Sequence, residues 1–219
     1  MHAALKPQRG DLSIVKGRFI GAAPWVGLTL RHLLTTAGID LIGDSVTIAP
    51  VPGTEAGNIN FGVAAAKALE DRKIDGFWAN GMGAEVAVQS GTGVIVLDVR
   101  RGDGPEGCFH YTMASIAAAD RLIEGSPEIA ADAVRAVVDA QRALKADPGL
   151  ALQIGRKLFP PTEAALIGEL IRRDLPFYDP EIPQQAVDGM ICFARSSGLM
   201  ERKPRYDEIV AERFSALWQ

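Results

Sequence analysis

A polar residue, Asn80, stands where a short apolar segment meets a segment rich in Ala and Val. Residues 76–79 have strand character, and residues 82–90 have the composition of a helix. Such a junction leaves backbone N–H groups at a helix N-terminus, and in an open α/β sheet ligands bind beyond the carboxyl ends of the strands. Asn80 adds a side-chain donor and acceptor, so Asn80, Gly81 and Met82 are candidate ligand contacts. A plain strand-to-helix connection with Asn80 as the helix cap is the alternative interpretation.

A second candidate loop follows the strand expected at residues 18–23. Pro24, Trp25 and Val26 begin the next expected helix, and its N-terminus suits an anionic group. The Trp25 ring could stack on a planar ligand. The alternative is that the Trp25 side chain packs into the core of a tight turn.

The third candidate loop, at Gly53 and Thr54, is the weakest of the three. Both residues follow the Pro-rich end of an expected strand and precede an expected helix. Thr54 and Asn58 could therefore contact a ligand, or they could cap that helix. Glu85 and His32 are interpreted as residues on helix surfaces.

Cys108 and His110 stand two residues apart on an expected strand, so both side chains point to one face. A Cys–His nucleophile pair can be drawn from them. No third orienting group or oxyanion site accompanies the pair, so buried structural roles are favoured. The His and Cys residues are spread too far apart for a metal site, and no nucleotide-binding loop or paired-acid motif occurs. The sequence predicts no metal, no cofactor and no enzymatic activity.

The composition is that of an ordinary globular protein. Of the 219 residues, 47% are hydrophobic, and the net charge of −4 argues against a nucleic-acid partner. No apolar run approaches the length of a membrane-spanning helix, and residues 1–11 lack the features of a signal peptide. Taken alone, these features predict a cytoplasmic protein.

Short apolar strands that alternate with helices are expected to position the three loops. Strands are expected at 18–23, 45–49, 76–79 and 94–98, and helices at 25–37, 58–71 and 82–90. Such alternation predicts a parallel sheet with helices on its faces.

The pattern changes after residue 99. Residues 100–107 form a polar, Gly-rich connection, and residues 108–113 have the pattern of one more strand. The remaining segments are expected to be helices: 117–123, 127–146, 148–158, 162–174, 183–197 and 206–217. A lone strand needs partners for its backbone groups, and the sequence shows no obvious partner for residues 108–113.

Three short sequence motifs, at residues 15–21, 33–40 and 68–79, occur in an order and spacing found in a known family. From residue 11 to its end, the chain resembles the substrate-binding proteins of ABC importers of the nitrate, sulfonate and taurine type. The same family includes the thiamine-pyrimidine synthase-like proteins. The helical stretches 127–147 and 160–174 also fit the resemblance.

The resemblance implies an α/β protein of the type II periplasmic-binding-protein fold, with two lobes around a ligand cleft. Residues 11–99 would form one near-complete lobe, and residues 100–107 would be the hinge crossing. Residues 108–219 would be a strand plus helices that belong to the other lobe, which is partial and mostly helical. Full-length members begin further upstream, with a secretion signal, so the chain is expected to be a fragment or a truncated relative. The family is periplasmic, which conflicts with the cytoplasmic location expected of this chain as a natural full-length product.

The function implied by the resemblance is that of the solute-binding component of an ABC importer. The ligand would be a small organic anion or heteroaromatic, such as a sulfonate, nitrate or a pyrimidine, and the partner would be an ABC permease. Two alternatives are an enzyme on the same scaffold, of the pyrimidine-synthase or desulfinase-like kind, and an inactive fragment. An unpaired sheet edge also predicts a homo-oligomer, because a dimer could supply missing strands by swapping.

Overall fold

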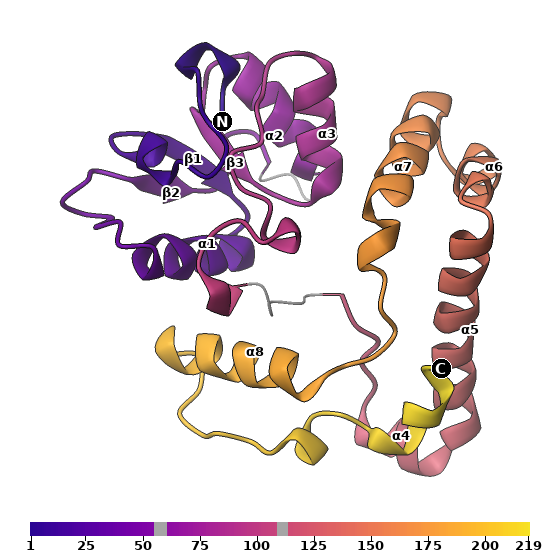
Figure 1. Cartoon of the computed structure of the whole chain (residues 1–219). Helices are drawn as coiled ribbons and strands as arrows, with labels where there is room; N and C mark the ends of the chain where they lie inside the picture. The colour runs from indigo at the N-terminus through magenta and orange to yellow at the C-terminus, as the bar shows by residue number, and fades with distance from the viewer. Residues whose placement is uncertain (55–60, 109–113) are drawn as a thin grey trace. The chain divides into compact units, whose positions relative to one another are not determined.

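The computed structural model describes residues 1–54, 61–108 and 114–219. The chain divides into two units, which we call unit 1 (Met1–Phe109) and unit 2 (His110–Gln219). Unit 1 contains a parallel sheet with its helices, and the described part of unit 2 is helical (Figure 1). The α/β class expected from the sequence is therefore confirmed.

Within the described residues, the sheet of unit 1 has three parallel strands in the order β2-β1-β3. The strands are β1 Phe19–Ala22, β2 Thr47–Ala49 and β3 Gly76–Trp78. Each lies inside a strand expected from the sequence, and the parallel pairing is confirmed. Gly21 of β1 is opposite Ala49 on one side and Phe77 on the other. Because the strands are parallel, the loops that follow them leave the sheet at the same edge.

Three helices of unit 1 cover the two faces of this sheet. They are α1 Pro24–Thr36, α2 Phe61–Glu70 and α3 Gly81–Gln89. Consecutive residues of a strand point to opposite faces. Phe77 packs against a cluster built largely from α2 and α3, whereas Trp78 donates its indole N–H to Thr29 of α1 (Nε1···Oγ1 3.3 Å). Thus α1 lies on one face, and α2 and α3 lie on the other.

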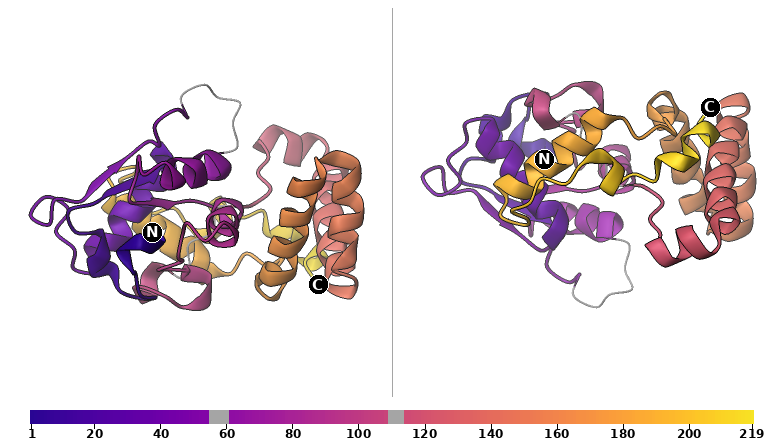
Figure 2. Two further views of the ribbon diagram at one scale, coloured as in Figure 1. Left: turned by 90° about the horizontal axis from the view of Figure 1, so that it is seen from above. Right: turned by 90° about the horizontal axis from the view of Figure 1, so that it is seen from below.

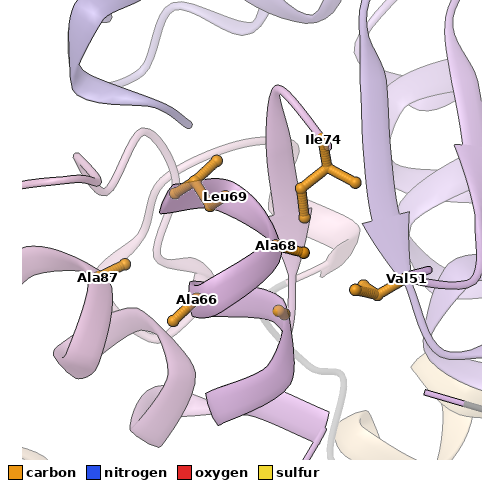
Figure 3. Packing of buried hydrophobic residues seen from close by; sticks show 7 residues of the cluster. Val51, Ala66, Ala68, Leu69, Ile74 and Ala87 are labelled. Carbon is orange, nitrogen blue, oxygen red and sulfur yellow. The ribbon is translucent and has the colours of Figure 1, made fainter. Parts of the chain in front are cut away.

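Small and aliphatic side chains form the core between the sheet, α2 and α3 (Figure 3). The cluster consists of Val51, Ala65, Ala66, Ala68, Leu69, Ile74 and Ala87. Gly62 of α2 and Gly83 of α3 bring the two helices closest together. A Cβ atom built on Gly83 would lie 2.6 Å from the Cα and the carbonyl oxygen of Gly62. The two backbones are therefore in direct contact at this point.

Residues 94–98, expected to be a fourth strand, do not belong to the sheet, so that prediction is wrong. Residues at the N-terminus form some of the backbone hydrogen bonds of this segment. The N–H of Val94 donates to the carbonyl oxygen of Met1 (2.9 Å). The Met1 side chain lies against Gly76 of β3, where its Sδ atom would collide with any added Cβ. The N–H of His2 also donates to the carbonyl oxygen of Asp75 (2.8 Å), just before β3, and the N–H of Ala3 donates to that of Thr92 (2.8 Å), so the start of the chain lies between Asp75 and the segment that leads to residue 94.

Five α-helices lie within the described residues of unit 2. They are α4 Asp120–Gly125, α5 Pro127–Ala146, α6 Gly149–Leu158, α7 Pro161–Asp174 and α8 Gln184–Ser196. Four of them, α5 to α8, coincide closely with helices expected from the sequence, whereas α4 begins three residues later and ends two residues later than the helix expected at 117–123. Helices α6 and α7 lie side by side (Figures 1 and 2), and Gly155 of α6 faces Ala164 of α7 there.

Short 3-10 helices, labelled η, occur in the connections and near both ends. They are η1 Ala3–Leu5, η2 Leu12–Val15, η3 Val99–Arg101, η4 Glu106–Cys108, η5 Leu175–Phe177, η6 Tyr206–Glu208 and η7 Glu212–Leu217. The segments η6 and η7 replace the single helix expected at 206–217, so that prediction is wrong. The backbone turns at Ala211 (φ −76°, ψ 74°) between them. The turn allows Val210 and Phe214 to join two different hydrophobic clusters.

The strand expected at residues 108–113 lies almost wholly outside the described residues. Cys108, its first residue, is the last residue of η4. His110 is outside the described residues, so its shared face with Cys108 stays a prediction. Within the part of the chain that the structure describes, no helix is both long and apolar enough to cross a bilayer.

Arg72 adopts a left-handed backbone conformation (φ +56°) in the turn between α2 and β3. Glycine adopts this conformation at a lower cost, although it also increases the entropy of the unfolded chain. We expect Arg72→Gly to raise the free energy of unfolding by about 0.5–1 kcal/mol. Urea unfolding followed by circular dichroism measures the change. Lys73→Gly is the matched control, because Lys73 does not have a left-handed backbone, and this variant should be less stable than the native chain. A lower free energy of unfolding for both variants would contradict the prediction.

Candidate functional site

The carboxyl edge of the sheet brings the candidate loops together. Ala22 of β1 pairs with Trp78 of β3, so the segments that lead to Pro24 and to Asn80 leave the sheet as neighbours. The helices that follow, α1 and α3, lie on opposite faces. The order β2-β1-β3 therefore places a topological switch point between β1 and β3, and ligands of open α/β sheets bind at such points.

Asn80 occupies the N-cap position of α3, but its side chain makes no capping hydrogen bond. The residue is exposed, whereas Gly81 and Met82, in the first turn of α3, are half-buried. The interpretation of Asn80 as a side-chain helix cap is therefore wrong. Its amide group lies at the switch point, where it could donate and accept hydrogen bonds.

Pro24 is the first residue of α1, and the Ala23 before it provides no side-chain cap. Trp25 follows and is 69% exposed, so the alternative in which Trp25 packs into the core is wrong. Val26 is half-buried, and its carbonyl oxygen accepts a hydrogen bond from the Thr29 hydroxyl (2.8 Å). An exposed indole thus adjoins a helix N-terminus that has no side-chain cap.

Gly53 and Thr54 follow β2 at the same edge of the sheet. Gly53 is exposed and has a left-handed backbone (φ +87°). The hydroxyl of Thr54 donates to the carbonyl oxygen of Val51 (2.7 Å), and so does its N–H (3.2 Å). These bonds hold a local turn. Asn58 lies outside the described residues, and a ligand contact from Gly53 or Thr54 stays a prediction.

Sequence reasoning missed the residues that hold this edge in place. The Gly62–Gly83 contact adjoins the Asn80 side chain, because a Cβ on Gly62 would lie 3.1 Å from Oδ1 of Asn80. Thr29 is buried and accepts the indole N–H of Trp78. The sequence did contain a signal for the Gly62–Gly83 contact. Both glycines stand inside expected helices, where glycine is unfavourable unless close packing requires it.

Cys108, Glu85 and His32, the other polar residues singled out in the sequence, show no arrangement typical of a catalytic or metal site in the described part of the chain. Cys108 is only 1% exposed, which suits a structural thiol better than a nucleophile. Glu85 accepts a hydrogen bond from the side chain of Gln89 (2.9 Å), and His32 is half-buried rather than exposed. Within residues 1–54, 61–108 and 114–219, no group of His, Cys, Asp and Glu could hold a metal ion.

The chemistry of this edge favours a small anion or a planar neutral solute. Two helix N-termini with partial positive charge open near each other, and none of the candidate residues is charged. Trp25 offers an aromatic face, and Asn80 offers a neutral donor and acceptor. Comparisons with protein-family models, with curated proteins and with solved structures found no match for this chain.

Proposed function

We propose that this chain forms part of a solute-binding protein of an ABC importer of the nitrate, sulfonate and taurine type. The observation that carries the proposal is the convergence of the Trp25 and Asn80 loops at one edge of a parallel sheet. The helix N-termini would attract an anionic group, Trp25 would stack on a planar part, and Asn80 would fix the orientation of the ligand.

The proposal extends to the type II periplasmic-binding-protein fold. Residues 11–99 would act as one lobe, residues 100–107 as the hinge crossing, and residues 108–219 as part of the other lobe. Affinity would arise when lobes close around the solute. A permease partner, a periplasmic location and self-association through a strand edge belong to the same proposal. Light scattering that finds a monomer at all concentrations would contradict the proposed self-association.

The ligand class can be tested by thermal unfolding of the full chain with taurine, methanesulfonate, nitrate and a pyrimidine as probes. A ligand that binds only the native state raises the unfolding midpoint. At a hundredfold excess over Kd, we expect a rise of about 5–10 °C for one of these probes. If none of them shifts the midpoint even at millimolar concentration, the proposed function fails.

Asn80→Ala should weaken binding of the probe that shifts the midpoint by about 10–100-fold, the usual effect of losing a hydrogen bond to a charged group. Titration calorimetry measures the Kd. Gln89→Ala is the matched control, because Gln89 lies at the other end of α3. We expect the control to bind as the native chain does. An unchanged Kd for Asn80→Ala would show that Asn80 does not contact the ligand.

A further inference from the structure

An apolar cavity of about 120 Å³ lies within unit 1, beside β3. Helices α1 and α3, the segment 94–97 and the start of the chain surround it. The residues that line it are of apolar types, and they include Leu30, Leu34, Leu69, Trp78 and Ala84. Residues 94–97, which line part of it, do not pair with β3. None of the residues proposed above to contact the imported solute lines this cavity.

The side chains that line the cavity offer water few partners. A buried water needs two to four polar partners. The N-terminal ammonium of Met1 borders the cavity and donates to the carbonyl oxygen of Val94 (3.0 Å). The only polar side-chain group among the lining residues is the indole N–H of Trp78. That N–H already donates to the Thr29 hydroxyl (3.3 Å). Apolar cavities of roughly 150 Å³ in other proteins stay dry and take up benzene or xenon. The present cavity is similar in size and is lined by apolar side chains, and it is partly open to solvent.

We propose that this cavity is a binding site for a small apolar molecule about the size of benzene. The ligand would contact the side chains of Leu30, Leu34 and Leu69 and the ring of Trp78. Binding would follow from dispersion contacts with walls that otherwise lack a partner on one side. The site is independent of the proposed import function, because it shares no contact residue with it.

Xenon under pressure is the first probe, and methyl NMR of the full chain is the readout. We expect the methyl signals of Leu30, Leu34 and Leu69 to shift with xenon pressure, and those of Leu166, buried in unit 2, to stay in place. Equal shifts at all four leucines, or shifts at none, would overturn the proposal. This measurement needs no variant.

Benzene is the second probe, with thermal unfolding as the readout. We expect saturating benzene to raise the midpoint by about 2–4 °C and the bulkier tert-butylbenzene to have no effect. Ala84→Leu places a larger side chain in the cavity and should abolish the benzene shift. Ala133→Leu, at an exposed position of α5, should keep it. A benzene shift that survives Ala84→Leu would contradict the proposal; if Ala84→Leu does not fold, the xenon experiment decides.

Discussion

Gly83→Ala is expected to lower the free energy of unfolding of unit 1 by about 2–3 kcal/mol. The added Cβ would lie 2.6 Å from the Cα and the carbonyl oxygen of Gly62. Both are backbone atoms, so a change of side-chain rotamer cannot relieve the collision, and α2 and α3 must move apart. Urea unfolding can be followed by Trp78 fluorescence in a chain that carries Trp25→Phe and Trp218→Phe, which leaves one tryptophan of three.

The matched control for this substitution is Gly107→Ala in the same unit. A Cβ on Gly107 would meet no atom within 4 Å, and the residue has no left-handed backbone. We expect its stability to stay within about 0.5 kcal/mol of the native value. Gly62→Ala should resemble Gly83→Ala, and the double variant should lose less than the sum, because the first substitution already separates the helices. Equal stability of Gly83→Ala and Gly107→Ala would contradict the close contact.

The Gly62–Gly83 contact also bears on the proposed solute site. Oδ1 of Asn80 lies beside Gly62, so separation of α2 from α3 would displace the Asn80 loop relative to α2. If the proposed function is correct, Gly83→Ala should therefore lower the affinity for the solute as well as the stability of the fold. Titration at a temperature where the variant is still folded separates the two effects.

Leu69→Ala is expected to lower the free energy of unfolding by about 3–4 kcal/mol. Leu69 is 1% exposed, belongs to the core cluster of unit 1 and also lines the apolar cavity. Removal of its side chain would enlarge a void that already exists. The cost of such a substitution rises with the volume that stays empty, so the loss should lie well above the lower end of the usual range of about 2–5 kcal/mol. The same Trp78 fluorescence assay measures it.

Ile42→Ala, in the same unit, is the control for the leucine substitution. Ile42 is 91% exposed, so its truncation should change stability by no more than about 0.5 kcal/mol. A similar loss for Leu69→Ala and Ile42→Ala would show that the burial of Leu69 contributes little. A loss for Leu69→Ala well below about 2 kcal/mol would show that the cavity collapses around the smaller side chain.

Local pattern was sufficient to find most elements of this protein. The helix that begins at Pro127 could be predicted because Pro fits the first turn and apolar residues recur with helical spacing. The three paired strands could be predicted because each is short, apolar and followed by a helix. The loops after them could be placed at one edge by the same reasoning, since parallel strands end on the same side.

Two expected elements are absent because their partners are distant in the sequence. Residues 94–98 have the pattern of a strand, but a strand needs a neighbour, and Met1 takes a hydrogen bond of Val94 instead. The segment 206–217 has the pattern of a helix, but Val210 and Phe214 pack into different clusters. Each outcome depended on contacts that no local window contains.

Local sequence patterns are enough to specify an α/β chain with three strand–loop–helix junctions and helices in its second half. These features follow from the period of the hydrophobic residues and from the positions of Pro and Gly, which act over a few residues. Other features emerge only in the folded chain: Trp25 is exposed, Asn80 is not a side-chain cap, Gly62 meets Gly83 and a cavity remains beside β3. Exposure, close packing and voids depend on segments that meet in space after the chain has folded, so no local pattern encodes them.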